Sequence, residues 1–179
     1  MKNAFVMIVC AAGLIGAAAR ADSDHLVATV IPAQTLAAVA AAAPDGEVSD
    51  QQVVHVESAE GRLGIGIVHR PLLEAAGPVA GIRHDRQSEV YRVLAGSGTL
   101  VTSSRMSQVK NLDPDGEIVR TLTGPSAVGV IEEIDDSRQI GEGDVVIIPA
   151  GVAHGFSEIT APITYMVVRV DPERLVALK

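Results

Sequence analysis

The sequence contains no tryptophan, and its single cysteine is Cys10. Cys10 lies in an apolar N-terminal run, so removal of that run leaves a chain without thiols. Such a chain forms no disulfide and no thiolate metal site. Aromatic residues make up only 2% of the sequence. Outside the N-terminal run, recognition of sugars or nucleobases by ring stacking would therefore depend on Tyr91, Phe156 and Tyr165 alone.

Basic residues are also scarce. The 14 Lys and Arg residues are outnumbered by 22 Asp and Glu residues, which gives a formal charge of −8. An acidic surface repels the phosphate backbone of nucleic acids. The composition therefore argues against a nucleic-acid partner.

The first 21 residues differ in kind from the rest. Lys2 precedes an apolar, alanine-rich run at 4–19, and Ala19-Arg20-Ala21 has the small-x-small pattern of a cleavage site. These features predict a secretory signal peptide at 1–21 and a periplasmic or secreted protein. The alternative, a membrane anchor, needs about 20 apolar residues, and this run is shorter. Cleavage would leave 12 basic and 22 acidic side chains, a charge of −10, and no membrane segment.

The remaining chain is long enough for one domain with a proper core. Residues 22–50 are predicted to form an arm with one short helix at 31–43, because Pro32 suits a first helical turn. Residues 51–179 are predicted to be all-β, since short apolar stretches alternate with Gly and Pro turns. The predicted strands lie at 53–57, 63–69, 89–94, 99–102, 145–148 and 163–170, with the third and fourth forming a hairpin around Gly96-Ser97-Gly98.

The segment 103–143 is longer than a simple connection between strands requires. Alternating apolar residues at 118–122 and 128–134 are typical of strands, which predicts an inserted hairpin or lid here. The segment also carries an acid cluster, interpreted as a solvated turn with an outer calcium site as the alternative. The cluster consists of Glu132, Glu133, Asp135 and Asp136.

The segment 143–154 is the most informative part of the sequence. Its apolar residues at 145–148 are bounded by turn residues, which favours a buried strand over a helix. Pro149 fixes its own φ and Gly151 permits a positive φ, so the turn that follows is tight. Such a turn directs His154 at one defined point inside a barrel.

A second segment, 84–98, pairs with the first, and together they resemble the two signature motifs of the cupin superfamily. The first motif is matched by His84, Glu89 and Gly96, and the second by Gly143, Pro149, Gly151 and His154. Ile82 occupies the position of the first motif histidine, and Glu158 that of a frequent asparagine. The resemblance covers about 53–171. It implies an all-β fold, an antiparallel cupin-type β-barrel or double-stranded jelly roll with one short N-terminal helix.

In the cupin pattern the metal ligands lie on adjacent strands and point into the barrel. The resemblance thus makes His84, Glu89 and His154 candidate ligands for a divalent metal ion, with Fe, Mn, Zn, Ni and Cu not distinguished. Two imidazoles and one carboxylate leave positions open for substrate and dioxygen or water. The alternative is that Ile82 marks a site that no longer binds metal tightly. A compensating ligand is the third interpretation, with Tyr91, Gln87 or Glu158 nearest in sequence.

Alternation along each strand places Tyr91 inward with Glu89, and Glu158 on the side of His154. Tyr91 and Glu158 are therefore the predicted catalytic residues for proton transfer. Two arginines near the first motif are interpreted either as solvated charge or as binding groups for an anionic substrate at the barrel mouth. These are Arg83 and Arg86.

Three functions are compatible with these residues. The first is a metal-dependent enzyme, an oxygenase, lyase or isomerase, that acts on a small oxygenated or carboxylate molecule. The second is a module that binds a small ligand or a metal without turnover, and the third is a structural dimer. The resemblance also implies a homodimer. No DNA-binding helix pair accompanies the barrel, which disfavours the transcription-regulator type of cupin.

Overall fold

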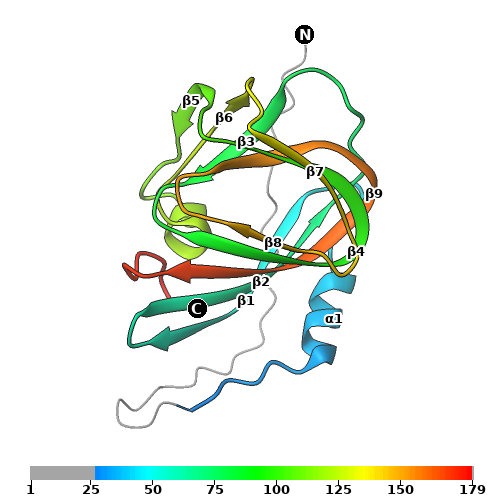
Figure 1. Ribbon diagram of the computed structural model, residues 1–179. Coiled ribbons are helices and arrows are strands. Elements are labelled where there is room, and N and C mark those ends of the chain that lie inside the picture. Colours follow the sequence, from blue (N-terminus) through cyan, green and yellow to red (C-terminus); the bar gives the residue numbers. More distant parts are fainter. Residues whose placement is uncertain (1–26, 179) are drawn as a thin grey trace.

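A computed structural model describes residues 27–178, which form one short helix followed by antiparallel β-structure (Figure 1). Helix α1 comprises Ala33–Ala41, and a π-helical turn comprises Val119–Thr123. The predicted leader at 1–21 lies outside the described residues. No helix within 27–178 is long and apolar enough to cross a membrane. The strands are β1 (Ser49–Ser58), β2 (Gly61–Arg70), β3 (Val79–His84), β4 (Ser88–Ser103), β5 (Ser107–Asn111), β6 (Ser126–Ile131), β7 (Asp136–Gly141), β8 (Val145–Ile148) and β9 (Ala153–Asp171).

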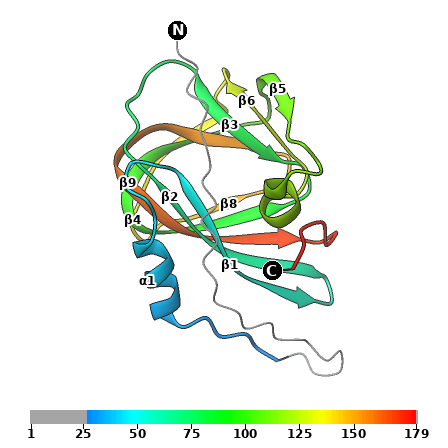
Figure 2. The same ribbon diagram turned by 180° about the vertical axis from the view of Figure 1, so that it is seen from behind.

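Two long strands, β4 and β9, organise the sheet. They pair with each other from Ser88↔Val170 to Ser103↔Ala153. The other side of β9 pairs with β2 and β3, and the other side of β4 pairs with β8 and β7. One layer therefore has the order β1-β2-β9-β4-β8, and the other has β5-β6-β3-β9-β4-β7 (Figures 1 and 2). This arrangement confirms the predicted antiparallel jelly roll with one N-terminal helix, although the outer strands leave the sheet open at its edges.

The two layers share a corner at Gly96 of β4 and Pro162 of β9. Gly96 has a φ of +80°, and the register between the two strands shifts on both sides of it. A Cβ atom at Gly96 would lie only 2.0 Å from the carbonyl oxygen of Pro162. The predicted hairpin around Gly96-Ser97-Gly98 is therefore wrong, because Gly96 bends one continuous strand instead of reversing the chain.

The segment 103–143 contributes β5, β6 and β7, which all belong to the layer β5-β6-β3-β9-β4-β7. β5 and β6 form an antiparallel pair, β6 also pairs with β3, and β7 pairs with β4. The strand predicted at 118–122 is wrong, since the chain forms the π-helical turn there. Val119 and Leu122 are both buried, and a spacing of three residues places two side chains on one side of a helix.

The core lies between the two layers. Val68, Tyr91 and Tyr165 face it from one layer, and Leu100 and Phe156 face it from the other. Helix α1 lies outside the sheet beside β1 and β2 (Figure 2). Polar groups that reach the core must therefore come from the inner faces of the strands.

Candidate metal centre

The three predicted ligands come from three strands at the end of the barrel opposite the Gly96 corner. His84 ends β3, Glu89 is the second residue of β4, and His154 is the second residue of β9. The predicted turn is confirmed, because Gly151 has a φ of +87°. The backbone N–H of Gly151 donates to the carbonyl of His84 at 2.8 Å, which ties the turn before His154 to the end of β3.

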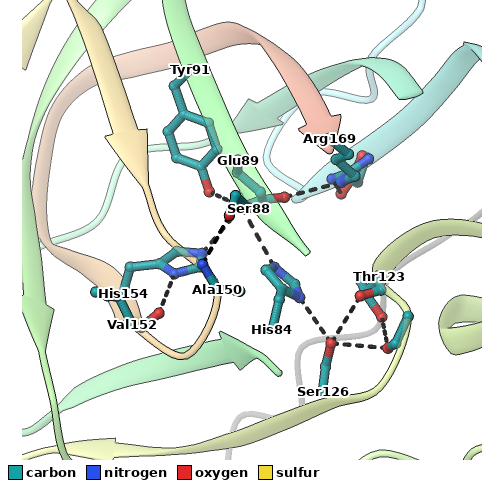
Figure 3. A network of polar contacts seen from close by, with 12 residues as sticks. His84, Ser88, Glu89, Tyr91, Thr123, Ser126, Ala150, Val152, His154 and Arg169 are labelled. Atoms are coloured by element: carbon teal, nitrogen blue, oxygen red, sulfur yellow. Dashed lines mark hydrogen bonds and ion pairs between the residues drawn. The ribbon is translucent and has the colours of Figure 1, made fainter. Parts of the chain in front are cut away.

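The three side chains converge on one point (Figure 3). Oε2 of Glu89 lies 3.5 Å from Nε2 of His84 and 3.4 Å from Nε2 of His154. All three side chains are at most 5% exposed. Within residues 27–178, they are the one group of three or more His, Cys, Asp or Glu residues whose ligand atoms all lie within 4.8 Å of one another.

Hydrogen bonds fix which nitrogen of His154 carries the proton. Nδ1 of His154 lies 3.1 Å from the carbonyl oxygen of Val152. A carbonyl only accepts, so Nδ1 is the donor, and Nε2 of the neutral ring carries a lone pair. This lone pair faces Oε2 of Glu89.

His84 is held in the same way by a hydroxyl group. Its Nδ1 lies 2.8 Å from Oγ of Ser126, which in turn donates towards the carbonyls of Thr123 and Gly124 at 3.1 and 3.0 Å. With its proton used there, Ser126 accepts from Nδ1 of His84, which leaves Nε2 of that ring bare as well. Two imidazole lone pairs and a carboxylate oxygen therefore meet, an arrangement that a divalent cation satisfies.

The charge state of Glu89 agrees with this arrangement. Burial raises the pKa of Glu89, but its neighbours His84, His154 and Arg169 lower the pKa well below its usual range. Glu89 is therefore an ionised carboxylate, as a metal ligand must be.

Each oxygen of Glu89 also has a donor of its own. Oη of Tyr91 donates to Oε2 at 2.8 Å, and Nε of Arg169 donates to Oε1 at 3.0 Å. Burial and the charge of Glu89 raise the pKa of Tyr91 well above its usual value. The phenol therefore remains protonated, and the predicted inward position of Tyr91 is confirmed.

Arg169, which is 3% exposed, is a residue of the centre that the strand patterns did not identify. Besides Glu89 it contacts Oδ2 of Asp50 at 2.5 Å and Oε1 of Gln52 at 3.2 Å. Its position on β9 has the same parity as the inward Tyr165 and Val167, so strict alternation would have placed it inside. Since Arg169 holds Oε1 of Glu89, only Oε2 is directed at the two imidazoles.

Two of the three residues considered as compensating ligands lie elsewhere. Gln87 is buried, and its amide nitrogen donates to the carbonyls of Leu122 and Thr123 in the π-helical turn at 3.2 and 3.0 Å. Glu158 is half-buried and is not part of the ligand group. Tyr91 is thus the one of the three that contacts a predicted ligand.

The position of Glu158 follows from an irregularity in β9. The register shifts between Thr99↔Glu158 and Leu100↔Phe156, which inserts one extra residue into β9. Phe156 and Ile159 consequently both pack in the core although they are three residues apart. Alternation from His154 therefore fails at this bulge and no longer places Glu158 on the same face.

The other predicted polar groups lie at the surface. Arg83 pairs with Asp85 at 2.9 Å, and the exposed Arg86 pairs with Glu173 at 3.2 Å. Each acid of the cluster after β6 has a separate protein partner. The pairs are Glu132 with Ser107, Glu133 with Arg105, Asp135 with Ser104 and Asp136 with Arg138.

Two cavities lie away from the three predicted ligands. One of about 350 Å³ lies along β7 and β8, and one of about 210 Å³ reaches Ser126 from the side of Asp85 and Pro125. The three ligand side chains line neither cavity. The candidate centre is therefore recognised from the chemistry of its donor atoms and not from a cavity.

No family model and no curated protein matches the sequence. Solved structures similar to the chain include the cupin domain of Schizosaccharomyces pombe Cnp3, at 9% identity and a TM-score of 0.42 over 74% of this chain and 66% of that one. A cupin superfamily protein from Desulfitobacterium hafniense DCB-2 is similar at 11% identity and a TM-score of 0.42, over 72% and 82% of the two chains.

The DMSP lyase DddQ from Ruegeria pomeroyi DSS-3 is similar at 17% identity and a TM-score of 0.40, over 70% of this chain. The chain spans about half the length of that lyase, 53%. At these identities and scores the likeness concerns the fold alone. The jelly-roll assignment stands on the strand order described above.

Proposed function

We propose that this protein is an exported, metal-dependent enzyme of the oxygenase, lyase or isomerase type that acts on a small oxygenated or carboxylate molecule. The observation that supports it is the convergence of three buried acceptor atoms, Nε2 of His84, Nε2 of His154 and Oε2 of Glu89. Without a cation, these lone pairs would face one another in a site from which water is largely excluded.

The chain's own residues have separable roles in this proposal. A divalent ion held by His84, Glu89 and His154 would supply Lewis-acid chemistry. Tyr91 holds a proton at Oη beside Glu89 and is the proposed proton-transfer residue. Glu158 stays the second predicted catalytic residue. Arg169 orients Glu89 by holding Oε1.

The alternative function is a cupin module that binds a metal or small ligand without turnover. The near-complete burial of the three ligands supports it. A Tyr91→Phe variant separates the two functions. If the wild type turns over a substrate and the variant binds metal but does not, the protein is an enzyme that uses Tyr91. If no substrate screen detects turnover although the metal is fully bound, the protein is the binding module.

Elemental analysis tests the metal proposal first. The purified protein is expected to contain about one divalent metal ion per chain, and the His84→Ala and His154→Ala variants to contain almost none, because either change removes one of three ligands. The intact mass of the same sample shows whether the exported chain begins at Asp22.

His69→Ala is the matched control for this experiment. Nδ1 of His69 contacts Oγ1 of Thr164 at 3.0 Å, and His69 is not part of the ligand group. The control variant is expected to keep the metal. A wild-type protein that binds no metal after reconstitution with several divalent ions would contradict the proposal.

A second copy of this chain is the proposed macromolecular partner. The outer face of the layer β1-β2-β9-β4-β8 carries apolar side chains where a solvated sheet has polar ones. Register aligns Ile147, Val90, Val168 and Ile65 in one row across four strands. Ile147 is 71% exposed and the neighbouring Val145 is 57% exposed. A contiguous apolar face of this kind supports a sheet-to-sheet homodimer.

Light scattering with size-exclusion chromatography tests the dimer. The wild type is expected to elute as a dimer, and Ile147→Asp as a monomer, because the change places a charge on the most exposed residue of the apolar row. Val109→Asp on β5 is the control, since Val109 is 47% exposed on the other layer. A wild-type monomer, or a dimer unaffected by Ile147→Asp, would exclude this interface.

A further inference from the structure

Arg70 is a half-buried arginine that the metal centre does not use. It ends β2 and lies two residues after Val68, which faces the core. Its Nε donates to Oη of Tyr165 at 3.1 Å, and its Cζ lies 5.5 Å from the centre of the Phe156 ring. The guanidinium is therefore directed inward and held between two aromatic side chains.

No carboxylate in the described part of the chain pairs with Arg70. Among residues 27–178, every other arginine that is not exposed has one. These are Arg62 with Glu57, Arg83 with Asp85, and Arg169 with Asp50 and Glu89. The two Nη atoms of Arg70 make no hydrogen bond to a described residue, and neither atom is completely buried, so both are available to a ligand.

Arg70 remains charged in this position. Burial by itself would lower its pKa, but the neighbouring Tyr165, Tyr91 and Asp50 raise it above its ordinary value. A cation on an inner face without a counter-ion costs free energy. The contact with Phe156 offsets part of this cost.

A continuous line of inner-face groups connects Arg70 to the metal centre. The rings of Tyr165 and Tyr91 are 4.3 Å apart, and Tyr91 donates to Glu89. On the other layer, Phe156 lies two residues after His154 on β9. Arg70 therefore lies at one end of a cluster of aromatic rings, and the predicted metal ligands lie at its other end.

We propose that Arg70 binds a carboxylate group of the small molecule that this protein takes up. Its two Nη atoms present parallel N–H donors that match both oxygens of a carboxylate. The inference rests on the proposed function, because it assigns the anionic end of the substrate of the same site.

Isothermal titration calorimetry with succinate tests this proposal on the purified, metal-loaded protein. Arg70→Met is expected to weaken succinate binding at least 10-fold. Arg70→Lys keeps the charge but loses the two parallel N–H donors, and it is expected to weaken binding by a smaller factor. Succinamide, whose amide groups are planar like carboxylates but neutral, is expected to bind the wild type and Arg70→Met equally weakly. Metal content is measured on every sample, so failure of the metal site is recorded separately.

Arg86→Met is the matched control, because it removes the same charge from the exposed surface. It is expected to leave succinate binding unchanged. Equal succinate affinity in the wild type and Arg70→Met, in samples that are folded and metal-loaded, overturns the inference while leaving the metal site intact. Tighter binding of inorganic phosphate than of succinate also overturns the carboxylate assignment.

Discussion

Arg169→Met is expected to lower the free energy of unfolding by about 3–5 kcal/mol, the typical cost of removing one partner from a buried ion pair. The guanidinium of Arg169 is almost fully buried between the carboxylates of Glu89 and Asp50, at 3.0 and 2.5 Å. Its removal leaves two carboxylates without their cation inside the barrel. Urea denaturation of the metal-free protein measures the loss without a contribution from metal binding.

Arg138→Met is the control for this prediction. Arg138 pairs with Asp136 at 3.0 Å, but their side chains are 75% and 52% exposed. An exposed pair contributes at most about 1 kcal/mol, so this variant is expected to unfold close to the wild-type midpoint. A loss below about 1 kcal/mol for Arg169→Met would show that Arg169 does not stabilise the ligand Glu89.

Gly96→Ala is expected to destabilise the protein by at least about 3 kcal/mol, or to prevent folding. Two costs combine at this position. An alanine at a φ of +80° is strained by about 1–3 kcal/mol. Its Cβ would also lie 2.0 Å from the backbone oxygen of Pro162, so the two layers would have to separate at their shared corner.

Gly143→Ala separates the two costs, because Gly143 has a φ of +93° but a Cβ atom added there would have no neighbouring atom within 4 Å. This control variant is expected to lose only the dihedral cost, about 1–3 kcal/mol. Thermal and urea unfolding of both variants provide the comparison. If Gly96→Ala lost no more than Gly143→Ala, the contact with Pro162 would not be what fixes the corner.

Local patterns predicted the parts of this protein that local chemistry determines. Pro149 and Gly151 specify a tight turn without help from the rest of the chain, and the turn directs His154 as expected. His84, Glu89 and His154 each occupy an inward position on a regular strand. Their convergence therefore followed from spacing and the family resemblance together.

Interactions between distant segments could not be predicted in the same way. Arg169 depends on Asp50, 119 residues away in the sequence, and no local pattern pairs them. The bulge near Glu158 and the π-helical turn Val119–Thr123 change the phase of side chains that alternation assumes to be constant. The sequence drew attention to Arg83 and Arg86 because they flank a motif, whereas Arg70 became apparent only from its unpaired position inside the barrel.

The central place of β9 also determines when the chain can fold during synthesis. β9 is the last strand, yet it lies between β4 on one side and β2 and β3 on the other. Its partners in β4 precede it by 50 to 82 residues, from Ser103↔Ala153 to Ser88↔Val170. Pairing over such separations is slow, and neither layer is complete until β9 has emerged from the ribosome.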